Sequence, residues 1–426
     1  MERISMTPRP GWEQTIQRQG LIYNEALKDG RTVRYWNENA AYKFTMAEVL
    51  ELEKVTDNLH RMSVEAARFL AEEQLNPASP FAQMGISREG LEYARESLYR
   101  NDPDIYGRFD LVYSDPSKPA KMLEYNADTP TGLVEGSIVQ WYWFEDLFTS
   151  QGKEGYDQWN GIHEALVGRF RKYREYLRHD VTTNPNPLLH FGYTALDDSG
   201  EDVMTVEYLR ECALQAGFTA RDETGNPLYD EHGVPLPMAQ RIEMTQIGYN
   251  WDTQRFVDEH DQPIDHIFKL YPWEDLVSEE FGEPLTDTKP CGWIEPAWKM
   301  FLSNKMLSAA LWHLYPYHEN LVKTFVDEPR FMDSYVKKPL HGREGDNIEL
   351  HTPTQKIVQP GRYGAEGYVF QELVEIPNFR DEFGASNYPI LGSWVIDGES
   401  FGVGIRESDG PITDYYCRFV PNIIKD

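Results

Sequence analysis

The 426-residue sequence contains few cysteines and no long apolar segment. Its three cysteines, Cys212, Cys291 and Cys417, lie far apart and form no CxxC motif. This argues against a disulfide framework or a structural zinc site, and it suits a reducing compartment. No apolar run reaches the length of a membrane span, and the N-terminal MERISMTPRPGWEQ lacks the apolar core of a signal peptide. We therefore expect a cytoplasmic protein without a membrane partner.

Positive charge is also scarce. The chain has 41 Lys and Arg against 70 Asp and Glu, a formal net charge of −29. Such a surface repels the phosphates of nucleic acids, so no nucleic-acid partner is expected. It could attract a small cation such as a polyamine, although a generally acidic, solubilising surface is the simpler explanation.

Two common nucleotide motifs are absent, and one histidine pair is badly spaced for a metal. The sequence has no GxGxxG after a strand and no GxxxxGK[ST], so it predicts neither a Rossmann fingerprint nor a P-loop. His313 and His318 lie on either side of Pro316, which spoils the geometry of helical metal ligands. Any nucleotide chemistry must therefore depend on other residues.

Apolar periodicity predicts interleaved helices and strands. Thr45 and Glu48 form an expected capping box, and apolar residues then recur every three or four positions as far as Phe69. Further helices are expected at 87–99, 160–178, 205–218 and 303–316. Strands are expected at 109–114, 121–126, 188–196, 241–251, 265–271, 334–340, 366–376, 388–396 and 399–408. This order favours a mixed α/β (α+β) protein with antiparallel sheets flanked by helices, in one compact body.

Two predicted strands place polar side chains on one face each. Glu124 and Asn126 are two residues apart in KMLEYN, and Arg108 and Asp110 are two apart in GRFD. If the strands pair, the four residues form one cluster with three hard-oxygen groups, which Mg²⁺ prefers. On their own, Glu124 and Asn126 are explained as simply by a polar strand end that caps the next helix.

The segment YVKKPLHGREGDNI is typical of a phosphate site or of a basic hairpin turn. Its strand puts Lys337 and Lys338 on opposite faces, so one of them points inward or into a cleft. Gly342 and Gly345 then bracket a short loop containing Arg343. Glycines let backbone N–H groups approach phosphate oxygens, while a lysine supplies a point charge.

Three other residues support a phosphate site. Lys305 opens a predicted helix, and Gln371 lies at a strand exit that could present an amide and backbone groups to an adenine edge. Arg406 lies in an otherwise apolar hairpin, where an inward-facing cation needs an anionic partner. Together with the metal candidates these are the parts that phosphoryl transfer requires.

Six motifs, in order, resemble the synthetase domain of glutathionylspermidine synthase: EYNADTPT, WKMFLSNKMLSAALW, YVKKPLHGREG, FQEL, GIRES and CRFVPNII. The resemblance extends from about residue 10 to the end. It implies an ATP-grasp fold with a rearranged chain order and an ATP-dependent acid–amine ligase that acts through an acyl phosphate. Because the chain begins almost directly at the synthetase, it resembles members that lack the amidase domain.

The resemblance also assigns roles to residues. The implied metal ligands are Asp110, Glu124 and Asn126, and the implied contact of the acid substrate is Arg108. The implied ATP-binding residues are Lys305, Lys338, Gly342, Arg343, Gly345, Gln371 and Leu373, and Arg406 would steady the transferring phosphoryl group. The implied cofactors are ATP and two Mg²⁺ ions.

The substrates follow only in outline. The family joins a glutathione-like peptide to a polyamine-like amine, and a different acid and amine pair is nearly as well supported. The acidic residues of LDDSGED, namely Asp197, Asp198, Glu201 and Asp202, are candidates for the amine pocket, although the segment also fits a solvated turn. A catalytically silent nucleotide-binding homologue, a structural protein and a homodimer are further hypotheses. We expect one synthetase unit, with an N-terminal helical part (1–104), a metal and substrate part (105–300) and a nucleotide part (301–426).

Overall fold

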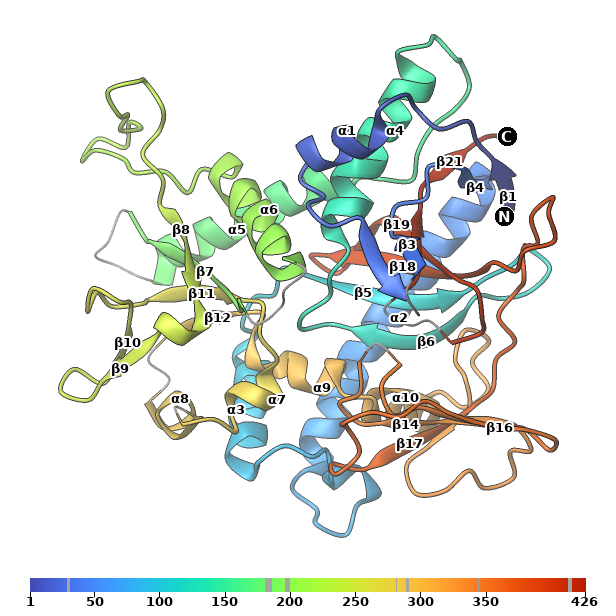
Figure 1. Ribbon diagram of the computed structural model, residues 1–426. Coiled ribbons are helices and arrows are strands. Elements are labelled where there is room, and N and C mark those ends of the chain that lie inside the picture. The colour runs from blue at the N-terminus through green and yellow to red at the C-terminus, as the bar shows by residue number, and fades with distance from the viewer. Residues whose placement is uncertain are drawn as a thin grey trace.

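The strand that carries Arg108 and Asp110 lies inside a five-stranded antiparallel sheet, with the order β20-β19-β18-β5-β6. The computed structural model (Figure 1) describes residues 1–28, 31–180, 186–195, 200–280, 282–288, 291–343, 345–412 and 416–426. The strands of this central sheet are β5 (Tyr106–Val112), β6 (Lys121–Asn126), β18 (Tyr388–Ile396), β19 (Glu399–Ser408) and β20 (Arg418–Val420). Every residue of β5 is buried, including the charged Arg108 and Asp110.

The predicted pairing of the two polar strands is confirmed. In the antiparallel register of β5 and β6, Arg108 lies opposite Asn126 and Asp110 lies opposite Glu124. Directly opposite residues have Cβ atoms about 5 Å apart, so the four side chains form two neighbouring cross-strand pairs. The register shifts just after Asp110, at the end of the polar face.

The first long helix, α2 (Met46–Glu73), packs against this sheet and has the predicted capping box. The Thr45 hydroxyl accepts a hydrogen bond from the Glu48 N–H, and the Glu48 carboxylate accepts one from the Thr45 N–H. Its apolar stripe is buried, and Thr56 bonds to Ser393 of β18 at 2.8 Å. Local pattern and packing therefore agree along this helix.

A second antiparallel sheet carries the lysine–glycine segment, with the order β13-β17-β14-β15-β16. Its strands are β13 (Thr324–Phe325), β14 (Tyr335–Pro339), β15 (Glu349–His351), β16 (Lys356–Val358) and β17 (Tyr368–Glu372). In Figure 1, β14 and β17 lie below β6 of the central sheet, and α10 (Met306–Leu314) lies beside them. The two sheets thus face each other across the region where the predicted site residues gather.

A third sheet is parallel, which the expectation of antiparallel sheets did not include. Its order is β12-β11-β7-β8, from β7 (Leu189–Tyr193), β8 (Ala239–Glu243), β11 (His266–Lys269) and β12 (Gly292–Ile294). A parallel pair needs a crossover, and α6 (Glu201–Gln215) packs on β7 and β8 as that crossover helix. The strand expected at 241–251 is interrupted by a 3₁₀ turn, Met244–Gln246, so it becomes β8 and a separate β9 (Gly248–Asn250).

The remaining elements complete the molecule around these sheets. The strands are β1 (Glu2–Ser5), β2 (Glu25–Lys28), β3 (Arg31–Arg34), β4 (Ala40–Phe44), β10 (Arg255–Val257) and β21 (Asn422–Ile424). The helices are α1 (Trp12–Arg18), α3 (Arg88–Arg100), α4 (Gln140–Phe144), α5 (Ile162–Asp180), α7 (Trp273–Leu276), α8 (Gly282–Thr288) and α9 (Met300–Ser303). Short 3₁₀ segments are Pro80–Ala82 and Ala297–Lys299, and π-helical turns are Glu135–Val139 and Glu145–Thr149.

One turn matches a short sequence motif of hydrolases. Residues 398–402, GESFG, fit the pattern GxSxG of a nucleophile elbow. They begin in the hairpin turn formed by Asp397 and Gly398, both of which have positive φ, and they continue into β19. A nucleophile elbow requires a strand-to-helix turn, so this segment is a β-hairpin and not a hydrolase motif.

Candidate functional site

The predicted site residues converge on one cavity of about 890 Å³. It lies where the central sheet and the second antiparallel sheet meet, and it is lined by residues from β5, β6, β14, β17 and β19. The predicted residues that line it are Arg108, Asp110, Glu124, Lys305, Lys338, Gly342, Arg343, Gly345, Gln371, Leu373 and Arg406. Residues separated by almost three hundred positions in the sequence are thus brought into one pocket of a size typical for small-molecule sites.

One predicted residue is placed differently, and two lie outside the described residues. Asn126 does not line this cavity; it lies in a small adjoining hollow, where its amide is 3.4 Å from the Glu124 carboxylate. Asp197 and Asp198, the candidates for the amine pocket, lie outside the described residues. Glu201, which belongs to the same LDDSGED segment and begins α6, does line the cavity.

Asp110 lies between two arginines. Arg108 donates from Nε to Asp110 Oδ1 at 3.0 Å, and Arg406 donates from Nη2 to Asp110 Oδ2. Burial alone would lower the pKa of Arg406, but the neighbouring Asp110 carboxylate raises it above the usual value. The anionic partner that Arg406 was expected to need is therefore Asp110.

Glu124, the cross-strand neighbour of Asp110, faces the lysines. Lys305 Nζ is 3.1 Å from Glu124 Oε2, and it also donates to the Gly342 carbonyl at 2.6 Å. Burial by itself would raise the pKa of Glu124, yet the charges of Lys305, Lys338 and Arg406 bring it well below its ordinary value. Glu124 is therefore ionised across the physiological range, as a metal-binding carboxylate must be.

The two lysines of β14 point in opposite directions, as the strand pattern predicted. Lys337 forms an ion pair with Glu349 of the neighbouring strand at 3.0 Å, whereas Lys338 lines the cavity. Lys338 Nζ donates to Gln371 Oε1 at 2.7 Å, and Gln371 Nε2 donates to the Leu123 carbonyl at 3.2 Å. Burial lowers the pKa of Lys338 to about 8.

The cavity lining as a whole has more acidic than basic residues, but positive charge predominates around Asp110 and Glu124. Arg108, Lys305, Lys338 and Arg406 face only two carboxylates, Asp110 and Glu124. The fifth cation of the cavity, Arg343, is paired outside this set with Glu274. A buried excess of cations is unfavourable unless an anion compensates it, so this end of the cavity is suited to a polyanion such as a nucleotide phosphate group.

The two carboxylates also fit a divalent cation that arrives with phosphate. Mg²⁺ is usually held by one or two carboxylates together with substrate phosphates and water. Asp110 and Glu124 meet this requirement, and the Asn126 side chain lies beside Glu124, to which its amide nitrogen donates. Within the described part of the chain, no group of three or more His, Cys, Asp or Glu side chains could form an all-protein metal cage. The donor set therefore fits Mg²⁺ bound jointly by protein and nucleotide.

Several cavity residues were missed from the sequence. Tyr23 and Tyr35, from either side of the β2–β3 hairpin, line the cavity, as does Glu13. The Arg108 guanidinium also donates to the Thr131 carbonyl in the turn after β6. Acidic and aromatic residues near the N-terminus gave no motif, because their place depends on packing against distant segments.

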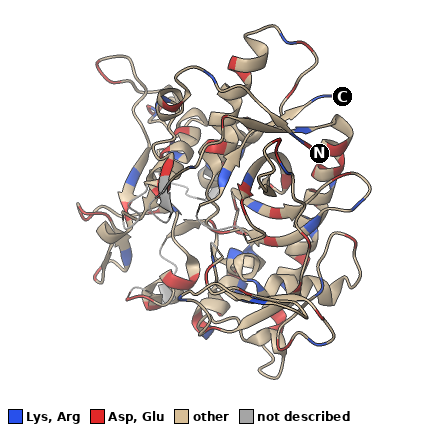
Figure 2. Cartoon of the chain, turned by 45° about the vertical axis from the view of Figure 1, so that its right-hand side comes forward, with Lys and Arg blue, Asp and Glu red and all other residues tan. Residues whose placement is uncertain are grey.

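Two observations concern the molecule as a whole. Asp and Glu are spread over helices, strands and loops (Figure 2), which agrees with a solubilising acidic surface. Among the described residues, the structure contains no helix that is both long and apolar enough to cross a membrane.

The sequence is similar to one protein family and to several known proteins. The family model described as "Glutathionylspermidine synthase preATP-grasp" matches residues 3–226 and 231–425. A protein of Haemophilus influenzae named "Putative acid–amine ligase" is 35% identical, and the match covers 99% of each chain. A trypanothione synthetase of Crithidia fasciculata is 26% identical over 75% of this chain and 47% of its own length.

Two further matches are more distant. A bifunctional glutathionylspermidine synthetase/amidase of Escherichia coli is 23% identical over 80% of this chain and 53% of its own length. This chain therefore spans about half of the two larger relatives. A solved structure of a glutathione synthetase-like effector from Globodera pallida shares the fold, with a TM-score of 0.56 at 9% identity, and the match covers 98% of this chain and 97% of that one.

Proposed function

The chain belongs to the glutathionylspermidine synthase preATP-grasp family, and on that premise we propose that it is an ATP-dependent acid–amine ligase. It joins a carboxylate to an amine as an amide and converts ATP to ADP and phosphate. The observation that carries this proposal is the excess of buried cations around two paired carboxylates in one cavity.

The reaction proceeds in two balanced steps. A carboxylate oxygen of the acid attacks the γ-phosphorus of ATP, which breaks the bond to the β-phosphate oxygen and yields an acyl phosphate and ADP. The amine nitrogen, as its free base, then attacks the acyl carbon; phosphate leaves with the bonding electrons, and the nitrogen loses a proton. Holding all three substrates in one cavity supplies the orientation that such a sequence requires.

The cations of the cavity act on the phosphates. Lys305 and Lys338 lie at the end of the cavity beneath the Gly342–Gly345 loop, where they would neutralise the nucleotide phosphates. Arg406, on the central sheet, would stabilise the negative charge that develops on the transferring phosphoryl group. Gln371 and Leu373, at the exit of β17, would border the adenine.

The carboxylates act on the metal. Asp110 and Glu124, with Asn126, would hold Mg²⁺, and we propose two ions because both carboxylates face the same phosphate end. When bound, Mg²⁺ neutralises phosphate charge and polarises the γ-phosphoryl group. Asp110 and Glu124, which now pair with Arg406 and Lys305, would supply carboxylate oxygens to the ion, and the two cations would then be available to phosphate oxygens.

The substrate end is proposed with less detail. Arg108 would bind a carboxyl group of the acid substrate beside the Thr131 wall. Asp197 and Asp198 remain candidates for the amine, and Glu201, from the same segment, lines the cavity. We propose a glutathione-like peptide and a polyamine-like amine, because related synthetases are named for such substrates. A homodimer is also proposed, and size measurement in solution would test it.

A screen of ADP release tests the function. Amines are crossed with glutathione and other small peptides in the presence of Mg²⁺ and ATP, and a ligase releases ADP only when both substrates are present. Two alternatives give different results. A ligase for another acid and amine pair releases ADP with a different combination of substrates. A silent homologue is stabilised against heat by Mg²⁺ and nucleotide but never releases ADP.

A further inference from the structure

Helix α7 is connected to both walls of the cavity by polar contacts, one buried and one partly buried. Asp128, in the turn after β6, accepts a hydrogen bond from the first N–H of α7, that of Trp273, at 3.0 Å. The next residue of the helix, Glu274, forms an ion pair with Arg343, which lies in the loop bracketed by Gly342 and Gly345, called the glycine loop below. One helix of four residues therefore contacts segments that are more than two hundred positions apart.

The first contact supports the wall next to Arg108. Asp128 precedes Thr131 and Gly132, which line the cavity, and the Thr131 carbonyl accepts a hydrogen bond from Arg108. Lys269, at the end of β11, fixes Asp128 from the other side at 2.7 Å and also donates to the Tyr271 carbonyl just before α7. The turn and the helix are thus held by the same buried ion pair.

The second contact supports the glycine loop. Arg343 lies in that loop next to Gly342, whose carbonyl accepts a hydrogen bond from Lys305. Arg343 is one-third exposed, whereas the Glu274 side chain is only 9% exposed. Burial would raise the pKa of Glu274, but the Arg343 charge lowers it below its ordinary value. The loop is therefore attached to a carboxylate that stays ionised in a largely dry site.

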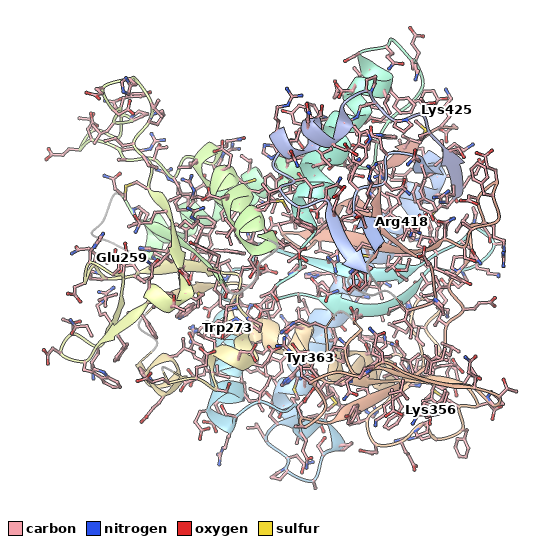
Figure 3. The ribbon with its side chains drawn as sticks, viewed as in Figure 1. Glu259, Trp273, Lys356, Tyr363, Arg418 and Lys425 are labelled. Atoms are coloured by element: carbon pink, nitrogen blue, oxygen red, sulfur yellow. The ribbon has the colours of Figure 1, made fainter. Side chains whose placement is uncertain are left out.

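The intervening contacts are rigid because they are buried. Lys269, Asp128 and Trp273 have at most 1% of their surfaces exposed. The Lys269 ammonium also lies 4.6 Å from the centre of the Trp273 ring, and the Trp273 indole donates to the Glu295 carbonyl at 2.9 Å. Trp273, labelled in Figure 3, lies near the middle of the molecule in this view. Such a network transmits a displacement better than a solvated surface contact does.

We propose that α7 couples the two walls of the cavity, with Glu274 as a positioning residue that holds the glycine loop in register with the Asp128–Gly132 turn. A phosphate group bound beside Gly342 and Arg343 would act on that turn through α7, and a carboxylate bound at Arg108 would act on Arg343 in return. The identities of the ligands rest on the proposed function, but the mechanical link does not.

Hydrogen exchange in the ligand-free protein tests the link directly. The substitution Glu274→Gln removes the charge and keeps the size, and Arg343 is exposed enough to be solvated after the change. We expect at least fivefold faster exchange at the amides of residues 340–343, with the unfolding midpoint unchanged. The matched control is Asp275→Asn, which removes an exposed carboxylate from the same helix and should leave that exchange unaltered.

A second variant tests the far side of the helix. Removing Asp128 alone would leave Lys269 buried and unpaired, so Asp128→Asn is combined with Lys269→Met. We expect exchange at 340–343 to increase in this double variant as well, although neither residue touches the loop. If only the Glu274 substitution loosens the loop, α7 is a local anchor and the proposed coupling is wrong.

Binding of MgADP by calorimetry separates this inference from the proposed function. We expect Glu274→Gln to weaken MgADP about tenfold, which corresponds to 1.4 kcal/mol, while kcat for ADP release stays within about threefold. If the unmodified protein binds no MgADP, the proposed function fails, and the exchange experiments still decide the link. An unchanged dissociation constant together with unchanged exchange in Glu274→Gln would overturn the positioning role.

Discussion

Lys338 offers a test of whether the cavity buries a positive charge at a cost in stability. Its side chain is 9% exposed, and burial lowers its pKa from 10.5 to about 8. The folded protein therefore releases this proton at a lower pH than the unfolded chain, which binds more protons between pH 8 and 10.5. Because stability rises with pH wherever the unfolded state binds more protons, the cost of burying the charged lysine is lost as the pH rises from about 8 to 10.5.

The size of the effect follows from the two pKa values. The difference between 10.5 and about 8 corresponds to about 3 kcal/mol, at 1.36 kcal/mol for each pKa unit. Lys338→Met removes the group and hence this dependence. The loss of the hydrogen bond to Gln371 has its own cost, about 1–3 kcal/mol, but that cost does not vary with pH. We therefore expect the stability of the variant relative to wild type to decrease by up to about 3 kcal/mol from pH 8 to 10.5.

The assay is chemical unfolding of both proteins at pH 7, 8.5 and 10. The control is Lys337→Met, which removes the neighbouring lysine from the other face, where it pairs with Glu349. This partly exposed ion pair contributes at most about 1 kcal/mol. A difference between Lys338→Met and wild type that stays constant with pH would refute the burial of a costly charge at this position.

The remaining predictions concern catalysis. Glu124→Ala should abolish ADP release while the circular dichroism spectrum stays unchanged. The control Glu349→Ala, on a strand away from the cavity carboxylates, should retain ADP release. Turnover in Glu124→Ala would exclude a role of Glu124 in metal binding. Arg406→Met should lower kcat by about 10² to 10³ with a small change in the KM for ATP, because its charge acts on the transferring group; an equal change in both would indicate ground-state binding instead. Arg108→Lys should raise the KM for the acid more than the KM for ATP, since a lysine cannot form the bidentate hydrogen bonds that a guanidinium makes with a carboxylate. Chelation of divalent metal should stop ADP release, and added Mg²⁺ should restore it.

Local patterns predicted much of the fold. The capping box at Thr45 placed α2 correctly, and alternation placed β5 and β6 and their hairpin. The predicted fold class, an ATP-grasp-type protein with several antiparallel sheets, is confirmed, as is the family. The division of the chain at residues 104 and 300 stays a prediction.

Long-range pairing limited the rest. The register of β7 against β11 joins segments more than seventy residues apart and has no local signal, so the parallel sheet was not expected. The Lys269–Asp128 pair spans 141 residues for the same reason. At the site, the residue types and alternation correctly brought Arg108, Asp110, Glu124 and Lys338 toward one place, but only the packed structure shows how they pair.

The pairing of β5 with β18 has a consequence for how the protein is made. Asp110 lies opposite Gly392 in that register, and its carboxylate accepts a hydrogen bond from Arg406, so both contacts wait for chain that is synthesised almost three hundred residues later. At about 5–20 residues per second, a ribosome needs roughly 15 to 60 s to cover that distance. During this time the β5–β6 hairpin keeps an unpaired strand edge and an incompletely neutralised pair of carboxylates. Folding of the central sheet is therefore a late event in translation, and newly made chains are expected to depend on chaperones that protect exposed strand edges.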